Sequence, residues 1–205
     1  SIKEALGDDG GEWNVPYPFI VDAVFQKYGI KNANGRVYPE SVLKKQVELY
    51  QQKINEHRAI GECNHPSESV IDLGRVSHNI IELHWEGHTL VGKMELNVSM
   101  GFVKHGICST LGDTVANLLM NGYKIGVSSR GIGSVEQRLG QTIVGDDYEL
   151  ICWDVVSDPS TPNAWIGNSE ELQQYVEDTE KHGDTINEVS TTEDKIDKIR
   201  NILKS

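Results

Sequence analysis

The sequence has few cysteines, and their spacing suits neither cross-links nor a metal site. Three cysteines occur among 205 residues, Cys63, Cys108 and Cys152, and none forms a CxxC pair. An odd number at wide spacing argues against a disulfide framework and against a structural zinc knuckle. We therefore expect the chain to fold on its hydrophobic core in a reducing compartment, with no metal and no other cofactor.

Long apolar runs and an excess of basic residues are also absent. No stretch approaches the roughly 18 consecutive apolar residues of a membrane span, and the first residues lack the basic-then-apolar pattern of a signal peptide. The chain carries 19 Lys and Arg against 31 Asp and Glu, a formal net charge of −12. Duplex binding needs a basic face that displaces counterions. We therefore expect neither a membrane nor nucleic acid as a partner.

Composition divides the chain into three parts. A chain of this length most often forms one main domain, but aromatic and β-branched residues thin out after Asn168. We expect a body over residues 17–168, preceded by a segment over 1–16 that is a candidate propeptide. The remaining residues, 169–205, read as a helical and flexible tail. Its last part, 193–204, places four apolar residues on one helical stripe and predicts an amphipathic helix.

Hydrophobic periodicity predicts an α+β body. Two helices, over 39–56 and 109–121, bury one face each. Period-two and β-branched segments predict strands over 18–26, 74–85, 88–97, 124–129, 132–138 and 147–157. Mostly neighbouring strands with only two helices favour an antiparallel arrangement. The predicted fold is a mostly antiparallel, partly closed β-barrel flanked by helices.

Three segments carry side chains suited to nucleophilic catalysis. His65 lies in the loop Gly61-Glu62-Cys63-Asn64-His65-Pro66, Ser128 and Ser129 lie in Gly126-Val127-Ser128-Ser129-Arg130-Gly131, and Asp154 lies within an apolar strand. Together they supply an imidazole base, a hydroxyl nucleophile and a carboxylate that orients the imidazole. Taken singly, each also has an ordinary reading, as a surface histidine, a glycine-flanked turn and a strand-end aspartate.

The order of these motifs resembles the prohead core protease family of large tailed bacteriophages, which is related to the herpesvirus capsid maturation proteases. The similar segments are Asn34-Gly35-Arg36-Val37-Tyr38-Pro39, the His65 loop, Val76-Ser77-His78, the Ser128 segment, and Asp154 through Ser160. The resemblance covers residues 17–168 and implies a herpesvirus-protease-like fold. It maps the base to His65, the nucleophile to Ser128 and the third member to Asp154.

Two alternatives within the site stay open. Herpesvirus relatives use a second histidine as the third member, which makes His78 the alternative to Asp154. Because strand side chains alternate between faces, a slip of one residue would place Ser129 on the active face instead of Ser128. A backbone amide near Ser129 or Arg130 is the expected oxyanion donor, and the Arg130 guanidinium is a candidate for binding a substrate carboxylate.

The resemblance also implies a substrate class and a setting. Family members cleave scaffold, core and capsid proteins after glutamate, usually with Ile or Leu two residues earlier and a small residue following. We therefore expect a serine endopeptidase that acts on core proteins and the major capsid protein inside the prohead, in the host cytoplasm, as a homo-oligomer. Recognition of glutamate needs a basic pocket, for which the candidates are Arg75, Lys124, Arg130 and Arg138.

Two sites in the chain itself match the same cleavage pattern. Ile2-Lys3-Glu4-Ala5 and Ile186-Asn187-Glu188 place an Ile two residues before Glu4 and Glu188, so we expect self-cleavage at both ends. Two other functions remain alternatives to a serine protease. One is a noncatalytic core or scaffold component with the same fold, and the other is a metal-dependent hydrolase.

Overall fold

A five-stranded antiparallel sheet forms the centre of the computed structural model, which describes residues 13–167. Its strand order is β10 (Ile166–Gly167), β1 (Phe19–Lys27), β5 (Thr89–Leu96), β4 (Val76–Glu86) and β3 (Ile60–Glu62). The β4–β5 pair is the predicted hairpin, and its turn is formed by Gly87 and His88, because Glu86 still pairs with Thr89. Gly87 has a positive φ of 54°. Residues 19–23 of β1 alternate between buried and more exposed positions, as strand periodicity requires, whereas its last five residues are all buried.

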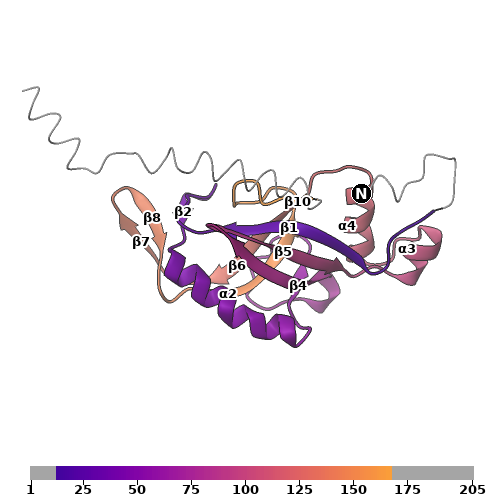
Figure 1. Cartoon of the computed structure of the whole chain (residues 1–205), viewed down its shortest axis with the longest axis horizontal. Coiled ribbons are helices and arrows are strands. Elements are labelled where there is room, and N and C mark those ends of the chain that lie inside the picture. Colours follow the sequence, from indigo (N-terminus) through magenta and orange to yellow (C-terminus); the bar gives the residue numbers. More distant parts are fainter. Residues whose placement is uncertain (1–12, 168–205) are drawn as a thin grey trace, which may run out of the picture. The chain divides into compact units, whose positions relative to one another are not determined.

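Two smaller sheets complete the strand content. An antiparallel ribbon pairs β6 (Gly126–Ile132) with β9 (Glu149–Val156). In the second, β8 (Gln141–Val144) lies between β7 (Val135–Arg138) and the short strand β2 (Arg36–Val37). Figure 1 shows the β7–β8 hairpin projecting from the body at the left.

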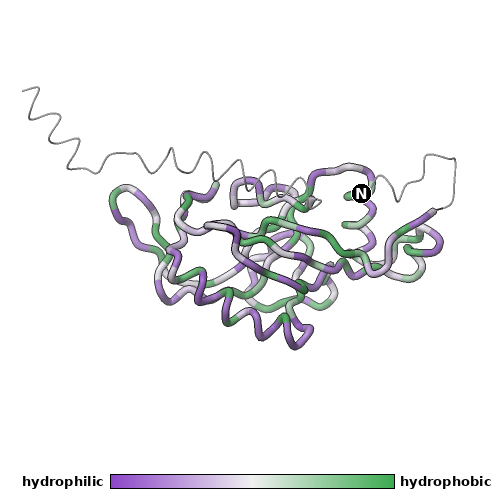
Figure 2. Tube along the Cα trace, viewed as in Figure 1, coloured by the Kyte–Doolittle hydropathy of each residue, from purple (hydrophilic) through white to green (hydrophobic). Residues whose placement is uncertain are grey.

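The helices pack on these sheets through amphipathic faces. Helix α2 (Glu40–Asn55) follows Pro39 and buries Leu43, Val47, Tyr50 and Ile54. Figure 2 shows the resulting alternation of hydrophilic and hydrophobic residues along α2. The Trp153 ring is fully buried and packs edge-on against Tyr50 and against Phe25 of β1, with ring centroids 5.0 and 5.6 Å apart. This core therefore holds α2, β1 and β9 together beneath the candidate site.

Two further helices lie at the other end of the sheet. These are α3 (Met100–His105) and α4 (Leu111–Met120), and a 3₁₀ turn, η1 (Leu73–Arg75), precedes β4. Thr110 and Asp113 form a capping box at the start of α4, and the Asp113 carboxylate also accepts hydrogen bonds from the amide and hydroxyl of Ser99. These bonds fix the start of α4 against the start of α3.

The α+β class and its antiparallel character are confirmed, but the predicted partly closed barrel is wrong, because the sheets do not close. Within residues 13–167, the β-bridges that join the five-stranded sheet region to the β6–β9 ribbon are single residue pairs, Cys63 with Val155 and Gly126 with Trp165, and no continuous ladder connects the two. The strands at these junctions, β3 and β10, are three and two residues long, which is too short to continue the ladder. The resemblance in fold to herpesvirus proteases stays a prediction.

Several predicted segments lie wholly or mainly outside residues 13–167. They are the segment 1–16, except for its last four residues, the tail 169–205 with its amphipathic helix, and the self-cleavage sites at Glu4 and Glu188. Within the described residues, no helix is both long and apolar enough to cross a membrane.

Candidate active site

The loop that carries His65 is anchored to two strands. It leaves β3 at Glu62, and the amides of Cys63 and Asn64 donate hydrogen bonds to the carbonyls of Arg75 and Val155. Asn64 has a positive φ of 64°, a conformation that asparagine adopts more readily than most residues. The loop therefore holds the His65 side chain, which is 43% exposed, over strand β9.

Glycine is required where this loop begins. A Cβ atom added to Gly61 would lie 2.1 Å from the Trp153 carbonyl oxygen and 2.5 Å from Nε2 of His78. Side-chain atoms do not approach backbone so closely, so β3 can pass between His78 and β9 only because residue 61 has no side chain. This explains the first residue of the Gly61-to-Pro66 motif.

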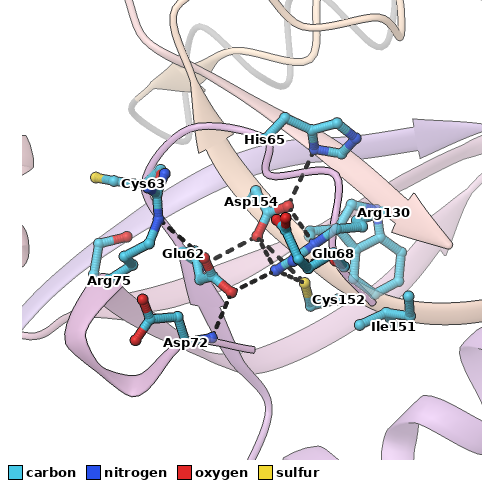
Figure 3. Close-up of polar contacts among 12 residues, drawn as sticks. Glu62, Cys63, His65, Glu68, Asp72, Arg75, Arg130, Ile151, Cys152 and Asp154 are labelled. Carbon is cyan, nitrogen blue, oxygen red and sulfur yellow. Dashed lines mark hydrogen bonds and ion pairs between the residues drawn. The ribbon is translucent and has the colours of Figure 1, made fainter. Parts of the chain in front are cut away.

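Ser128 and Asp154 lie directly across from each other in the β6–β9 ribbon. Residues that pair across antiparallel strands share a face, so both side chains project to the same side. The Asp154 side chain is fully buried, and its Oδ2 lies 3.1 Å from Nδ1 of His65 (Figure 3). The structure thus brings Asp154 into contact with His65 and places Ser128 on the same side of the ribbon.

The two serines of the tandem differ in their surroundings. Ser128 is 6% exposed, and its Oγ lies 3.2 Å from Oγ of Ser160. Ser129 is half-buried and pairs with Trp153, on the opposite face of the ribbon from Ser128 and Asp154. Strand alternation therefore gives the Asp154 face to Ser128.

Arg130 is buried within a network of carboxylates. Its Nε lies 2.9 Å from Oδ2 of Asp154, its Nη2 lies 2.9 Å from Oε1 of Glu62, and its Nη1 donates to the Glu68 carbonyl at 2.8 Å. Glu62 is fully buried and also contacts Nε of Arg75 at 3.2 Å. Figure 3 shows Glu62 between the two guanidinium groups, with Asp154 between Arg130 and His65.

These contacts change the expected role of Arg130. Its guanidinium is committed to Glu62 and Asp154 and is 5% exposed, which does not suit the binding of a substrate carboxylate. Sequence reasoning missed Glu62 as part of the site. The available signal was a carboxylate next to an apolar strand segment, three residues before His65, since a buried charge requires a partner.

The network keeps Asp154 ionised. Burial by itself would raise the pKa of Asp154, but the contact with His65, the hydrogen bond from the Glu62 amide and the charge of Arg130 together lower it below its usual value. A carboxylate with a lowered pKa retains its negative charge next to the imidazole. Asp154 can therefore orient His65 and stabilise its protonated form.

His78, the alternative third member, makes different contacts. It is 1% exposed, with Nε2 3.1 Å from the Trp153 carbonyl and Nδ1 2.9 Å from Oγ of Ser77. A carbonyl can only accept, so Nε2 donates and Nδ1 accepts from the Ser77 hydroxyl. Burial lowers the pKa of His78 to about 4. In these contacts His78 is a neutral group that links β4 to β9.

A cleft of about 640 Å³ opens beside His65. The run of residues 129–135 lines it, together with Arg36, Tyr38, Tyr148 and Ser160. Ser160 thus connects the cleft to the Ser128 hydroxyl. Among residues 13–167, no three His, Cys, Asp or Glu side chains are grouped so that they could hold a metal ion.

Comparisons with known proteins point to one family. The family model described as prohead core protein serine protease matches residues 2–175. The chain is 28% identical over 179 residues to the prohead core protein protease of Enterobacteria phage T4, which covers 86% of this chain and 81% of that protein. The structure of the bacteriophage T4 capsid assembly protease, gp21, is similar with a TM-score of 0.61 and 26% identity, covering 68% of this chain and 82% of that one.

Replacing Arg130 with methionine is expected to destabilise the fold strongly. Arg130→Met leaves Glu62 and Asp154 buried without their shared cation, and breaking a buried ion pair on one side typically costs about 3–5 kcal/mol. The measurement is the free energy of unfolding from denaturant titration. The control is Arg138→Met, because Arg138 pairs with Glu136 on the surface and such pairs contribute roughly 0–1 kcal/mol. Equal stability of the two variants would contradict the role assigned to Arg130.

Proposed function

The chain belongs to the prohead core protein serine protease family, and on this premise we propose that it is a serine endopeptidase in which Ser128, His65 and Asp154 form the catalytic triad. The contact between His65 and Asp154 carries the proposal. It leaves Nε2 of His65 free to take a proton while Nδ1 faces the carboxylate. The position of Ser128 across from Asp154 supports its assignment as the nucleophile.

The proposed reaction is acyl transfer in two halves. His65 Nε2 takes the Ser128 proton while Oγ forms a bond to the peptide carbonyl carbon, and the protonated imidazole then gives that proton to the departing amine. Water repeats the sequence on the acyl-enzyme and releases the acid product. Ser160 can donate its hydroxyl proton to Oγ of Ser128, which leaves the Ser128 proton available for the proposed transfer to His65.

Backbone amides are the proposed donors to the oxyanion. The amides of Ser129 and Arg130 follow the nucleophile by one and two residues in the chain, and one of them is the proposed donor to the tetrahedral intermediate. The Arg130 side chain is instead a positioning group, because it binds Asp154 and, through the Glu68 carbonyl, the loop that follows His65. The contacts of His78 with Ser77 and Trp153 favour Asp154 as the third member.

The proposed substrates are the core proteins and the major capsid protein within the prohead. The T4 relatives are named for the prohead core and for capsid assembly, which supports this substrate class. Cleavage after glutamate comes from the family resemblance and is part of the proposal. The homo-oligomer and the host cytoplasm stay predictions.

Removal of the Ser128 hydroxyl tests the proposed function most directly. We expect Ser128→Ala to reduce cleavage of a glutamate-containing core-protein substrate by roughly 10⁴- to 10⁶-fold. Ser129→Ala, the matched control, should retain substantial activity because Ser129 faces away from Asp154. Wild-type levels of cleavage by Ser128→Ala would contradict the assignment. No cleavage by the folded wild type would favour the noncatalytic alternative, and loss of cleavage with a chelator would favour a metal-dependent hydrolase.

The third member of the triad is tested by a pair of variants. Asp154→Asn should lower kcat by about 10⁴-fold, because an amide cannot hold the imidazole in the required tautomer or stabilise its charge. His78→Ala is expected to reduce stability more than kcat, since its contacts tie β4 to β9. Rates are compared at temperatures at which circular dichroism shows both variants folded. A larger loss of kcat in His78→Ala would support the herpesvirus-like triad.

We also predict that the chain trims its own ends after Glu4 and Glu188. The same triplet occurs at Ile60-Gly61-Glu62 and Ile80-Ile81-Glu82, but these lie in strands β3 and β4. Their backbones are paired with neighbouring strands, and a protease needs a substrate segment that can enter its active site. Intact mass after prolonged incubation should show both cuts in the wild type and neither in Ser128→Ala. Wild type that keeps both ends while cleaving an added substrate would rule out self-trimming, and identical trimming in Ser128→Ala would reveal a contaminating protease.

A further inference from the structure

The cleft beside His65 is unlike the rest of this acidic chain. The chain has a formal net charge of −12, yet among residues 13–167 no Asp or Glu lines the cleft. Asp147 lies next to the lining residue Ser134, but its carboxylate oxygens accept hydrogen bonds from the Ser134 amide and hydroxyl. Glu68 lies next to the lining residue Ser67 in the same way, and its carboxylate accepts from the Ser67 hydroxyl. Within the described part of the chain, the cleft lining itself therefore contributes no carboxylate.

Two arginines line the cleft, and only one of them is engaged by protein carboxylates. Arg130 is paired with Glu62 and Asp154. Arg36 is exposed, and its guanidinium makes no hydrogen bond or ion pair with residues 13–167. An arginine without a carboxylate partner in a cleft that holds no carboxylate is a site of positive potential.

The local structure fixes the backbone of Arg36 at the cleft. The amide of Arg36 donates to Oδ1 of Asn32 at 2.9 Å, and Gly35, with a positive φ of 75°, completes the turn before it. Arg36 then pairs with Thr142 of β8, while the next residue, Val37, is buried. Alternation along β2 therefore turns the Arg36 side chain away from the core.

The other cations that sequence analysis offered for acid recognition are engaged elsewhere. Arg75 contacts Glu62 and the Cys63 carbonyl, and Arg138 pairs with Glu136. Lys124 lies over the ring of Trp165, 4.9 Å from its centroid. None of these three residues lines the cleft.

We propose that Arg36 is the specificity-determining residue that recognises an acidic side chain of the peptide substrate next to the bond that is cut. The proposal rests on the proposed protease function. The proposed ligand group is the carboxylate of a substrate side chain, because a guanidinium binds a carboxylate through two parallel hydrogen bonds.

Cleavage of matched peptides tests the proposal. Two peptides differ only in Glu or Gln before the scissile bond, and the enzymes are wild type, Arg36→Gln and Lys45→Gln. Lys45 is an exposed cation of α2 outside the cleft, so Lys45→Gln controls for the loss of one positive charge. We expect Arg36→Gln to lower kcat/KM for the Glu peptide by roughly 10- to 100-fold, with the Gln peptide and Lys45→Gln little changed. A Glu preference that survives in Arg36→Gln would overturn the proposal.

Binding measured without catalysis separates this proposal from the protease function. In the Ser128→Ala background, fluorescence anisotropy should show weaker binding of the Glu peptide when Arg36→Gln is added, but not when Lys45→Gln is added. This result would support acid recognition even if wild type cleaved neither peptide, an outcome that contradicts the protease function alone. Equal affinity with and without Arg36→Gln would overturn the role of Arg36.

Discussion

The burial of Arg130 between Glu62 and Asp154 is the constraint on which the site depends. These three groups come from β6, β3 and β9, so satisfying their charges requires that the three strands meet in one arrangement. Removing charges from water costs several kcal/mol per ion, and a buried network contributes most to specifying a structure when every member is paired. Here the same pairing that offsets the burial of Arg130 also holds Asp154 ionised beside His65. The Arg130 guanidinium therefore contributes both to the stability of the fold and to the ionised state of Asp154, which orients the proposed base His65.

The histidine loop depends on the same constraint. Arg130 binds the Glu68 carbonyl, and Glu62 accepts from the Asp72 amide, so both ends of the segment after His65 are tied to the buried network. Gly61 permits the close passage of β3 beside His78 and β9. The result is a loop whose imidazole is held by backbone contacts on one side and by Asp154 on the other. Such preorganisation is what general base catalysis needs, because proton transfer requires the acceptor to be within hydrogen-bond reach.

Two arginines of similar appearance in the sequence have opposite roles in the structure. Arg130 is enclosed by carboxylates and contributes to the fold and to positioning. Arg36 is exposed in a cleft to which residues 13–167 contribute no carboxylate, and it has no acidic partner among those residues. The difference arises from burial, because a buried guanidinium needs counter-charges from its own chain, whereas an exposed one remains available to a ligand. A protein with a negative net charge can thus still have a positively charged site at one place on its surface.

The sequence by itself determined the α+β class, the helices α2 and α4, the β4–β5 hairpin and the strands β1 and β9, because their periodicity extends over eight or more residues. The motifs around His65, Ser128 and Asp154 were also enough to indicate the protease family. Strands β2, β3, β8 and β10 and helix α3 were missed, since segments of two to six residues carry too little periodicity to predict. Only the tertiary structure decided that the sheets do not close into a barrel, that Asp154 rather than His78 contacts His65, and that Arg130 is committed to Glu62. These outcomes depend on which distant side chains meet in space, and a buried charge selects its partner by proximity in the fold, which a linear sequence does not record.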